Sequence, residues 1–159
     1  MTAPEAASSR PTPDGIPLGD GYSTKITIAD DTDISFWEKA VTPPGLDGGD
    51  EIDLTTMHNT SYRTFGSRAL ATMTEMSCTA LYDPDVYDEI LAIINVETTI
   101  TVFFPDGSTL AFYGFLKRFE PGELVEGTPP ECTITIQPTN QDPTSRAEES
   151  AVMTEASGT

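Results

Sequence analysis

Several short runs of this chain alternate apolar and polar residues, and this is the period of a β-strand with one buried face. The runs are STKITIA, ISFWEKAV, EMSCTALY, TITVFF, TLAFYGFLKRF and ECTITIQ. Pro105-Asp106-Gly107-Ser108 joins TITVFF to TLAFYGFLKRF. Asp-Gly at such a junction predicts a hairpin with a type I′ turn, because both residues tolerate the positive φ that this turn requires. The pattern therefore constrains the chain to a mainly antiparallel β-structure.

The alternation also predicts which side chains face the core. Lys25 and Thr27 are expected on the opposite face of the first strand from its isoleucines, and Trp37 on the opposite face from its neighbour Phe36. The predicted inward residues are Ile26, Ile28, Ile34, Phe36, Met76, Cys78, Ala80, Tyr82, Ile134 and Ile136.

One helix is expected between EMSCTALY and TITVFF. Asp83 can cap it, Pro84 suits its first turn, and Asn95 is a suitable stop. Apolar residues at helical spacing form a stripe too broad for a solvated helix, so we expect the helix to pack on the sheet. This stripe consists of Val86, Tyr87, Ile90, Leu91, Ile93 and Ile94.

Composition places loose segments at both ends of one domain. The chain has 159 residues with 13 prolines and 12 glycines, and its ends carry no apolar period. We predict a flexible N-terminal arm at 1–21, a β domain at 22–140 and a flexible acidic tail at 141–159. The domain is expected to be an antiparallel β-sandwich or barrel-like sheet pair with one short α-helix packed on it.

The net charge of −18 limits the partners of this domain. Such a surface repels phosphate backbones and anionic lipids, so we expect no binding to nucleic acid or membranes. The N-terminus has neither a basic start nor an apolar stretch, so no secretory signal is expected. Cys78 and Cys132 both lie in strand-like runs; reduced core thiols are favoured, while a disulfide stays open if the two strands are neighbours.

The long connection at 42–73 has an unusual charge pattern. Leu54–Thr74 contains no acid but includes Arg63 and Arg68, whereas the later segment FEPGELVEGTPPE carries several glutamates and no base. Complementary segments of this kind can join two copies of one chain in a heterologous contact, which builds rings or filaments. The alternative is that both segments are ordinary solvated loops. EIDLTTM, within the long connection, could also form a strand.

No catalytic, metal or cofactor site is predicted. His58 and Ser61 lie close in the sequence, but a single histidine in a Thr/Ser-rich loop is far more often a surface or interface residue than a catalytic one. The aspartates of DGGDEID and DDTD lack the ligand spacing of a calcium loop, so we interpret them as solvated turns.

Taken in order, several segments resemble the major tail tube proteins of long-tailed, non-contractile bacteriophages. The resemblance covers about Lys25 to Asn140 and leaves both ends outside. Its elements are TKITIADDTDISFWEKAVTPPGLDGGDEIDLTTMHNTSYRT, ALYDPDVYDEILAIIN, TITVFFPDGSTLAFYGFLKRFEPGE and TITIQPTN.

The resemblance implies a structural, non-enzymatic protein of the virion tail that is assembled in the host cytoplasm. Six copies would form a ring, and rings would stack into a hollow tube around the tape measure protein, between tail tip and tail terminator proteins. DNA would pass through the tube without specific binding. The residues that the resemblance implies at contacts between rings are His58, Tyr62, Arg63, Phe65 and Arg68. The charge pattern adds Glu120, Glu123 and Glu126 as their acidic counterpart.

Two other interpretations stay open. One is a tube or head–tail connector component of a related injection machine, such as a type VI secretion system. The other is a monomeric β-sandwich binding module, which would need a concave aromatic patch with polar rim groups.

Overall fold

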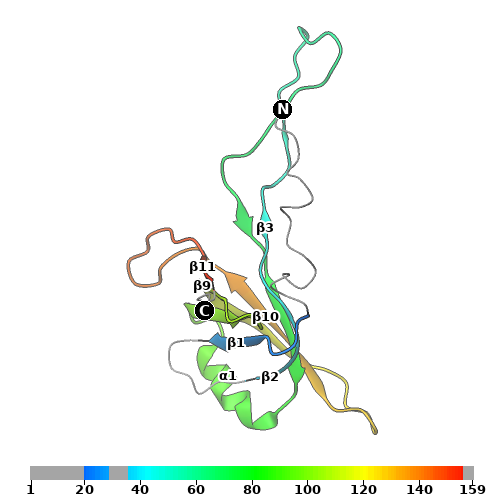
Figure 1. Ribbon diagram of the computed structural model, residues 1–159, viewed down its shortest axis with the longest axis vertical. Coiled ribbons are helices and arrows are strands. Elements are labelled where there is room, and N and C mark those ends of the chain that lie inside the picture. Colours follow the sequence, from blue (N-terminus) through cyan, green and yellow to red (C-terminus); the bar gives the residue numbers. More distant parts are fainter. Residues whose placement is uncertain (1–19, 29–35, 156–159) are drawn as a thin grey trace.

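A computed structural model of the chain describes residues 20–28 and 36–155. Its main element is a seven-stranded sheet in which every strand pair is antiparallel (Figure 1). In spatial order the strands are β1 (Lys25–Ile28), β8 (Thr98–Phe103), β9 (Thr109–Pro121), β10 (Glu131–Pro138), β7 (Met76–Leu81) and β2 (Trp37–Thr42), and β11 (Val152–Thr154) pairs with β9.

The sheet curls until its first and last strands meet. β1 and β2 lie at opposite ends of the strand order, yet the backbone N–H of Ile26 donates a hydrogen bond to the Glu38 carboxylate at 3.0 Å. The predicted mainly β fold, antiparallel and barrel-like with one short helix, is therefore confirmed.

The core lies on the inner face of this sheet, where the predicted alternation is confirmed. Ile26, Ile28, Met76, Cys78, Ala80, Ile134 and Ile136 are all at most 3% exposed. Phe36 is buried, Trp37 is 70% exposed as expected, and Tyr82 packs against the core from its edge. Ile34 lies outside the described residues. Each fully buried isoleucine contributes roughly 1.5–3 kcal/mol relative to leaving it exposed, so this face supplies much of the driving force for folding.

The turn of the β8–β9 hairpin differs from the prediction. Gly107 has φ +89°, but Asp106 is not among the residues with positive φ, so the type I′ prediction is wrong. The turn instead runs from Phe104 to Gly107, whose N–H donates to the Phe104 carbonyl at 3.0 Å. Pro105 explains this outcome, because its ring holds φ near −65° and suits the second position of a type I turn.

The helix begins and ends where the sequence predicts. The Asp83 carboxylate accepts a hydrogen bond from the Asp85 N–H at 3.0 Å, and a single 3₁₀ turn (Pro84–Val86) leads into α1 (Tyr87–Ile93). Asn95 terminates the helix with φ +61°, and its N–H donates to the Leu116 carbonyl of β9 at 3.0 Å.

The apolar stripe of this helix is narrower than predicted. Ile90 is buried against the sheet, and Val86 and Ile93 pack beside it. Tyr87 and Leu91 are 50% and 56% exposed, so the prediction that the whole stripe packs on the sheet is wrong for these two. A helix of seven residues presents one narrow face to its support, and these two side chains lie beyond it.

The sheet continues past the domain boundary that composition suggests at Asn140. After a loop, β11 (Val152–Thr154) pairs with the start of β9, and Ala151 packs against the core. An ion pair between Arg146 and Glu97, at 3.0 Å, connects this loop to the segment before β8. The C-terminal segment thus contributes a strand to the fold.

Gly114 of β9 provides a test of how closely β10 approaches. A Cβ atom at this position would lie 2.7 Å from the Gln137 carbonyl oxygen, which belongs to the backbone of β10. We expect Gly114→Ala to lower the free energy of unfolding by about 1–3 kcal/mol, as overpacking does. Chemical denaturation would measure it. The matched control is Gly48→Ala, where a Cβ meets nothing within 4 Å and a change within about 0.5 kcal/mol is expected; equal effects would contradict the prediction.

The two cysteines provide a second test. Cys78 and Cys132 are free and buried on the core face, and burial raises the pKa of Cys78 to about 12 and that of Cys132 above its usual value. Because the thiolate is the reactive form, we expect neither thiol of the native protein to react with an aromatic disulfide reagent at pH 8. Both should react in denaturant. Rapid labelling of the native protein would contradict this.

Candidate subunit interface

The connection at 42–73 forms a long arm that leaves the sheet and runs along the long axis of the molecule (Figure 1). The arm consists of an outgoing and a returning segment of the same chain. Near the sheet, β3 (Leu46–Asp47) pairs with β6 (Thr72–Met73). Farther out, β4 (Ile52–Asp53) pairs with β5 (Phe65–Gly66). The sequence suggested a strand over EIDLTTM, and of these residues only Ile52 and Asp53 of β4 are in strand conformation.

Two glycines allow the outgoing and returning segments of the arm to lie close together. A Cβ at Gly49 would lie 2.9 Å from the Arg68 side chain, and Gly49 also has φ +75°. A Cβ at Gly66 would lie 2.9 Å from the Leu54 side chain. The Arg68 Nε donates a hydrogen bond to the Asp50 carbonyl at 2.7 Å. Arg68 thus connects the outgoing and returning segments of the arm, a role that its charge alone did not predict.

The tip of the arm is organised by the side chain of Asn59. Its amide nitrogen donates to the Tyr62 carbonyl at 2.8 Å and to the Thr64 hydroxyl at 2.7 Å. Its amide oxygen accepts from the Thr56 N–H at 3.0 Å. A single side chain therefore closes the loop that carries His58.

The arm exposes many large apolar side chains. Leu46, Leu54, Met57, Tyr62, Phe65 and Leu70 are each more than half exposed, and Met57 is fully so. A two-stranded ribbon is marginally stable by itself, and exposed apolar surface of this kind marks interaction sites. The arm therefore has the properties of a segment that becomes buried on assembly.

Arg63 is the cation of the arm that a partner can reach most readily. Its guanidinium lies 3.5 Å from the Asp53 carboxylate, but the two side chains are 76% and 52% exposed, and exposed pairs of this kind hold little energy. Two hydrogen bonds from Thr55 lower the pKa of the Asp53 carboxyl. The larger effect comes from the Thr55 hydroxyl and the smaller one from its backbone N–H.

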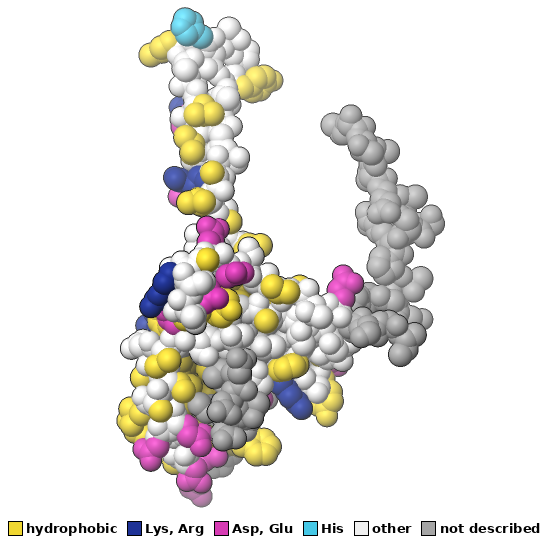
Figure 2. Space-filling view, turned by 90° about the vertical axis from the view of Figure 1, so that its left-hand side faces the viewer, with side chains coloured by type: hydrophobic (Ala, Val, Ile, Leu, Met, Phe, Trp, Pro, Cys, Tyr) yellow, Lys and Arg dark blue, Asp and Glu magenta, His cyan; other side chains and the backbone are white. Residues whose placement is uncertain are grey.

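The acidic counterpart lies far from the arm. Glu120 is on β9, while Glu123 and Glu126 are in the β9–β10 connection, which also exposes Leu124 and Val125. Figure 1 shows this connection at the end of the long axis opposite the arm tip. On the face drawn in Figure 2, carboxylates lie at that end of the molecule and also where the arm meets the sheet, but not at the arm tip. The predicted residues thus form two groups that one chain does not bring together.

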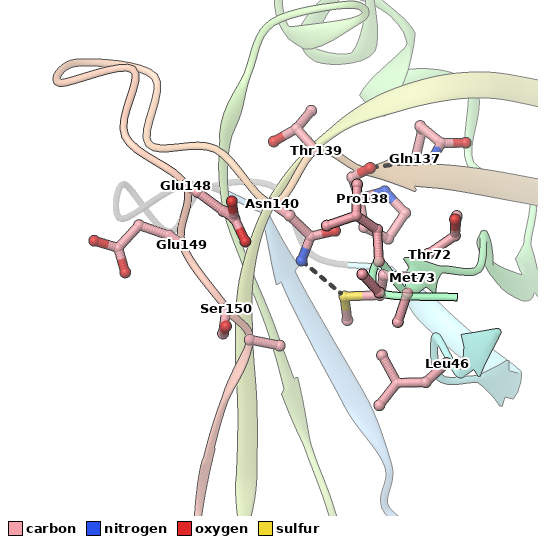
Figure 3. A pocket seen from close by; sticks show the side chains of 14 residues that line it. Leu46, Thr72, Met73, Gln137, Pro138, Thr139, Asn140, Glu148, Glu149 and Ser150 are labelled. Carbon is pink, nitrogen blue, oxygen red and sulfur yellow. Dashed lines mark hydrogen bonds between the residues drawn. The ribbon is translucent and has the colours of Figure 1, made fainter. Parts of the chain in front are cut away.

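The structure forms a groove at the base of the arm that sequence reasoning did not predict. It has a volume of about 650 Å³ and lies between the arm, the end of β10 and the loop before β11. In Figure 3, Leu46, Thr72 and Met73 face Glu148, Glu149 and Ser150 across it. The Asn140 side-chain amide contacts the Met73 sulfur at 3.6 Å. No local pattern could reveal this groove, because its walls are distant in the sequence.

The described parts of the chain hold neither a cluster of metal-binding side chains nor a helix that could cross a membrane. No group of three or more His, Cys, Asp or Glu side chains within 20–28 and 36–155 could hold a metal ion. In the same residues, no helix has the length and apolar character to cross a bilayer.

Comparison with solved structures identifies where this fold occurs. No family model and no curated protein matches the chain. A chain of the virion of a native gene transfer agent particle is similar with a TM-score of 0.59 and 11% identity, over 85% of this chain and 98% of that one. A chain in the tail of an empty gene transfer agent particle, described with C6 symmetry, gives 0.57 and 8%, over 87% and 98%. A chain of the anti-feeding prophage baseplate gives 0.52 and 8%, over 83% and 91%. The chain therefore shares a fold with subunits of phage-derived tail assemblies.

The hydrogen bonds of the Asn59 side chain at the arm tip can be tested by substitution. Asn59→Ala removes the acceptor of the Thr56 N–H, so we expect the Thr56 amide to exchange hydrogen faster by roughly fivefold, as loss of a bond worth about 1 kcal/mol implies. Global unfolding should not change, because the tip is remote from the core. Hydrogen exchange monitored by NMR would measure both. His58→Ala is the control, since His58 bonds the Thr56 hydroxyl through its backbone N–H; equal acceleration in both variants would contradict the assignment.

Proposed function

We propose that this protein is a structural subunit of a phage-type tail tube, in which hexameric rings stack into a hollow conduit. The observation that carries the proposal is that the arm tip, which belongs to the acid-free segment Leu54–Thr74, and the acidic β9–β10 connection lie at opposite ends of the long axis. A second copy displaced along this axis brings Arg63 of one chain toward Glu123 and Glu126 of the next. The shared fold with subunits of tail assemblies supports the same conclusion.

Contacts of this kind propagate. The arm and the acidic connection are different patches, so their contact is heterologous and repeats from copy to copy without closing on itself along the axis. The C6 symmetry of the similar gene transfer agent tail supports rings of six as the repeating layer. The remaining partners in this proposal are a tape measure protein within the tube, and tail tip and terminator proteins at its ends.

The net charge of −18 suits a conduit for DNA. A surface rich in carboxylates repels the phosphate backbone, so DNA would slide along it without a strong binding site. The protein would act in the virion tail after assembly in the host cytoplasm, with no catalytic step. His58, which the sequence predicts to be a surface or interface residue rather than a catalytic one, lies at the exposed arm tip, remote from the core.

A second candidate function is a baseplate or connector component of a related injection machine. The similarity to a chain of the anti-feeding prophage baseplate favours it. The two functions differ in their product, because a tube subunit adds layers without limit whereas a baseplate or connector subunit stops at one ring.

Charge exchange between the two patches tests the proposal. We expect the purified protein to form hollow tubes of uniform width in negative-stain electron microscopy, with a tail-tip complex as initiator if needed. Arg63→Glu should raise the critical concentration for tubes by roughly tenfold or more, because it places like charges together. Adding Glu123→Lys and Glu126→Lys to this variant should restore assembly. Arg68 stays unchanged, since it holds the arm together.

Three results would contradict the proposal. Lys25→Glu changes the net charge equally but lies on the exposed face of β1, so it serves as the matched control and should assemble normally. Normal tubes from Arg63→Glu, or equal impairment in both variants, would rule out the arm as the specific contact. A protein that stays monomeric with the initiator would argue against a tube subunit.

A further inference from the structure

The groove at the base of the arm has two chemically different walls (Figure 3). One wall carries the apolar side chains of Leu46, Leu70 and Met73 from the arm and Pro138 from the end of β10, with Thr72 and Asn140 beside them. The other wall is the loop before β11, with the carboxylates of Glu148 and Glu149. An apolar floor beside two carboxylates suits a ligand that is apolar and carries no negative charge.

The described chain leaves this groove open to a partner. Leu46 and Leu70 are each 82% exposed, although they line the same depression. Leucines exposed to this extent gain most from a partner that removes them from water.

We propose that this groove receives the arm tip of a second copy of this chain, and this inference rests on the tube function proposed above. The tip offers the matching chemistry, with Met57 and Tyr62 101% and 85% exposed. Leu54–Thr74 contains no acid, so the tip brings no like charge to Glu148 and Glu149. The imidazole of His58 can donate a hydrogen bond to either carboxylate.

The direction of the arm agrees with this contact. Groove and tip lie at the two ends of one arm, which follows the long axis of the molecule (Figure 1). A copy displaced by about one arm length in this direction therefore has its groove at the tip of the copy below. Arg63 stays available for the acidic β9–β10 connection, which need not belong to the same neighbour.

A second apolar groove is a poorer receptor. It is lined by Trp37, Leu81 and Phe103, and Lys25, Lys39 and Glu38 border it. Two lysines and one glutamate leave a net positive charge, so an arm tip that carries Arg63 and no acid would meet charge of its own sign there. Charge therefore favours the groove at the arm base.

Cysteine cross-linking in assembled tubes tests this contact. Full-length Met57→Cys and full-length Ser150→Cys would be mixed, assembled and treated with a short bismaleimide, with the buried Cys78 and Cys132 as an inert background. We expect covalent dimers on denaturing gels from assembled tubes and at least roughly tenfold fewer from unassembled protein, where encounters are bimolecular. The matched control mixes Met57→Cys with Leu81→Cys, which places the second thiol at the other groove.

The outcomes separate the two proposals. Tubes that form without Met57–Ser150 dimers, or with dimers no more abundant than in the Leu81 control, would overturn the groove contact and leave the tube function intact. Complete absence of tubes from the unmodified protein would overturn both. As a second variant, Leu70→Asp alters an exposed side chain and should fold normally, yet raise the critical concentration roughly tenfold; unimpaired assembly of this variant would also overturn the contact.

Discussion

The long strand β9 is the element on which the rest of the structure depends. It pairs with β8 on one side, and with β10 and β11 on the other. Its inward side chains Leu110, Phe112 and Leu116 are buried in the core, and Gly114 lets β10 approach closely. Because β10 leads into the loop before β11, β9 also determines where Glu148 and Glu149 lie relative to the arm. Packing at one strand thus positions a surface far from the core.

The arm is held together by a different kind of interaction. It buries little apolar surface, and instead relies on short backbone ladders, the amide of Asn59 and the Arg68 hydrogen bond to the Asp50 carbonyl. Segments stabilised in this way open at low free energy. An arm of this kind can adjust to a neighbour, and the neighbour can in turn supply the burial that the arm lacks. The molecule thus consists of a rigid sheet and an arm that can adapt to a neighbour.

Charge is segregated along the same axis as stability. The arm tip has no acid, whereas carboxylates lie at the base of the arm and at the opposite end of the molecule. A chain with a net charge of −18 repels its own copies at most orientations, so contacts that pair Arg63 with carboxylates favour one orientation. Repulsion elsewhere suppresses unordered aggregation, which matters for a protein that exposes large apolar side chains on a ribbon. Specificity and solubility therefore have the same origin here.

The sequence by itself determined the strands and their buried faces. The two-residue period fixes which side of a strand Ile26 or Ile134 occupies, and local backbone preferences place the helix between Asp83 and Asn95. It also located the charge contrast between the arm and the β9–β10 connection, since composition is a property of the sequence. These features were predictable because each depends on residues close together in the chain.

Only the tertiary structure decided how those pieces meet. Pro105 changed the turn type against the local Asp-Gly signal, and β11 joined the sheet from a segment whose composition suggests a loose tail. The groove combines Leu46 with Glu148, more than half the chain apart. The arm and the acidic connection lie far apart because they precede β7 and β10, which are neighbouring antiparallel strands. Such placements result from packing between remote segments, and no local pattern encodes them.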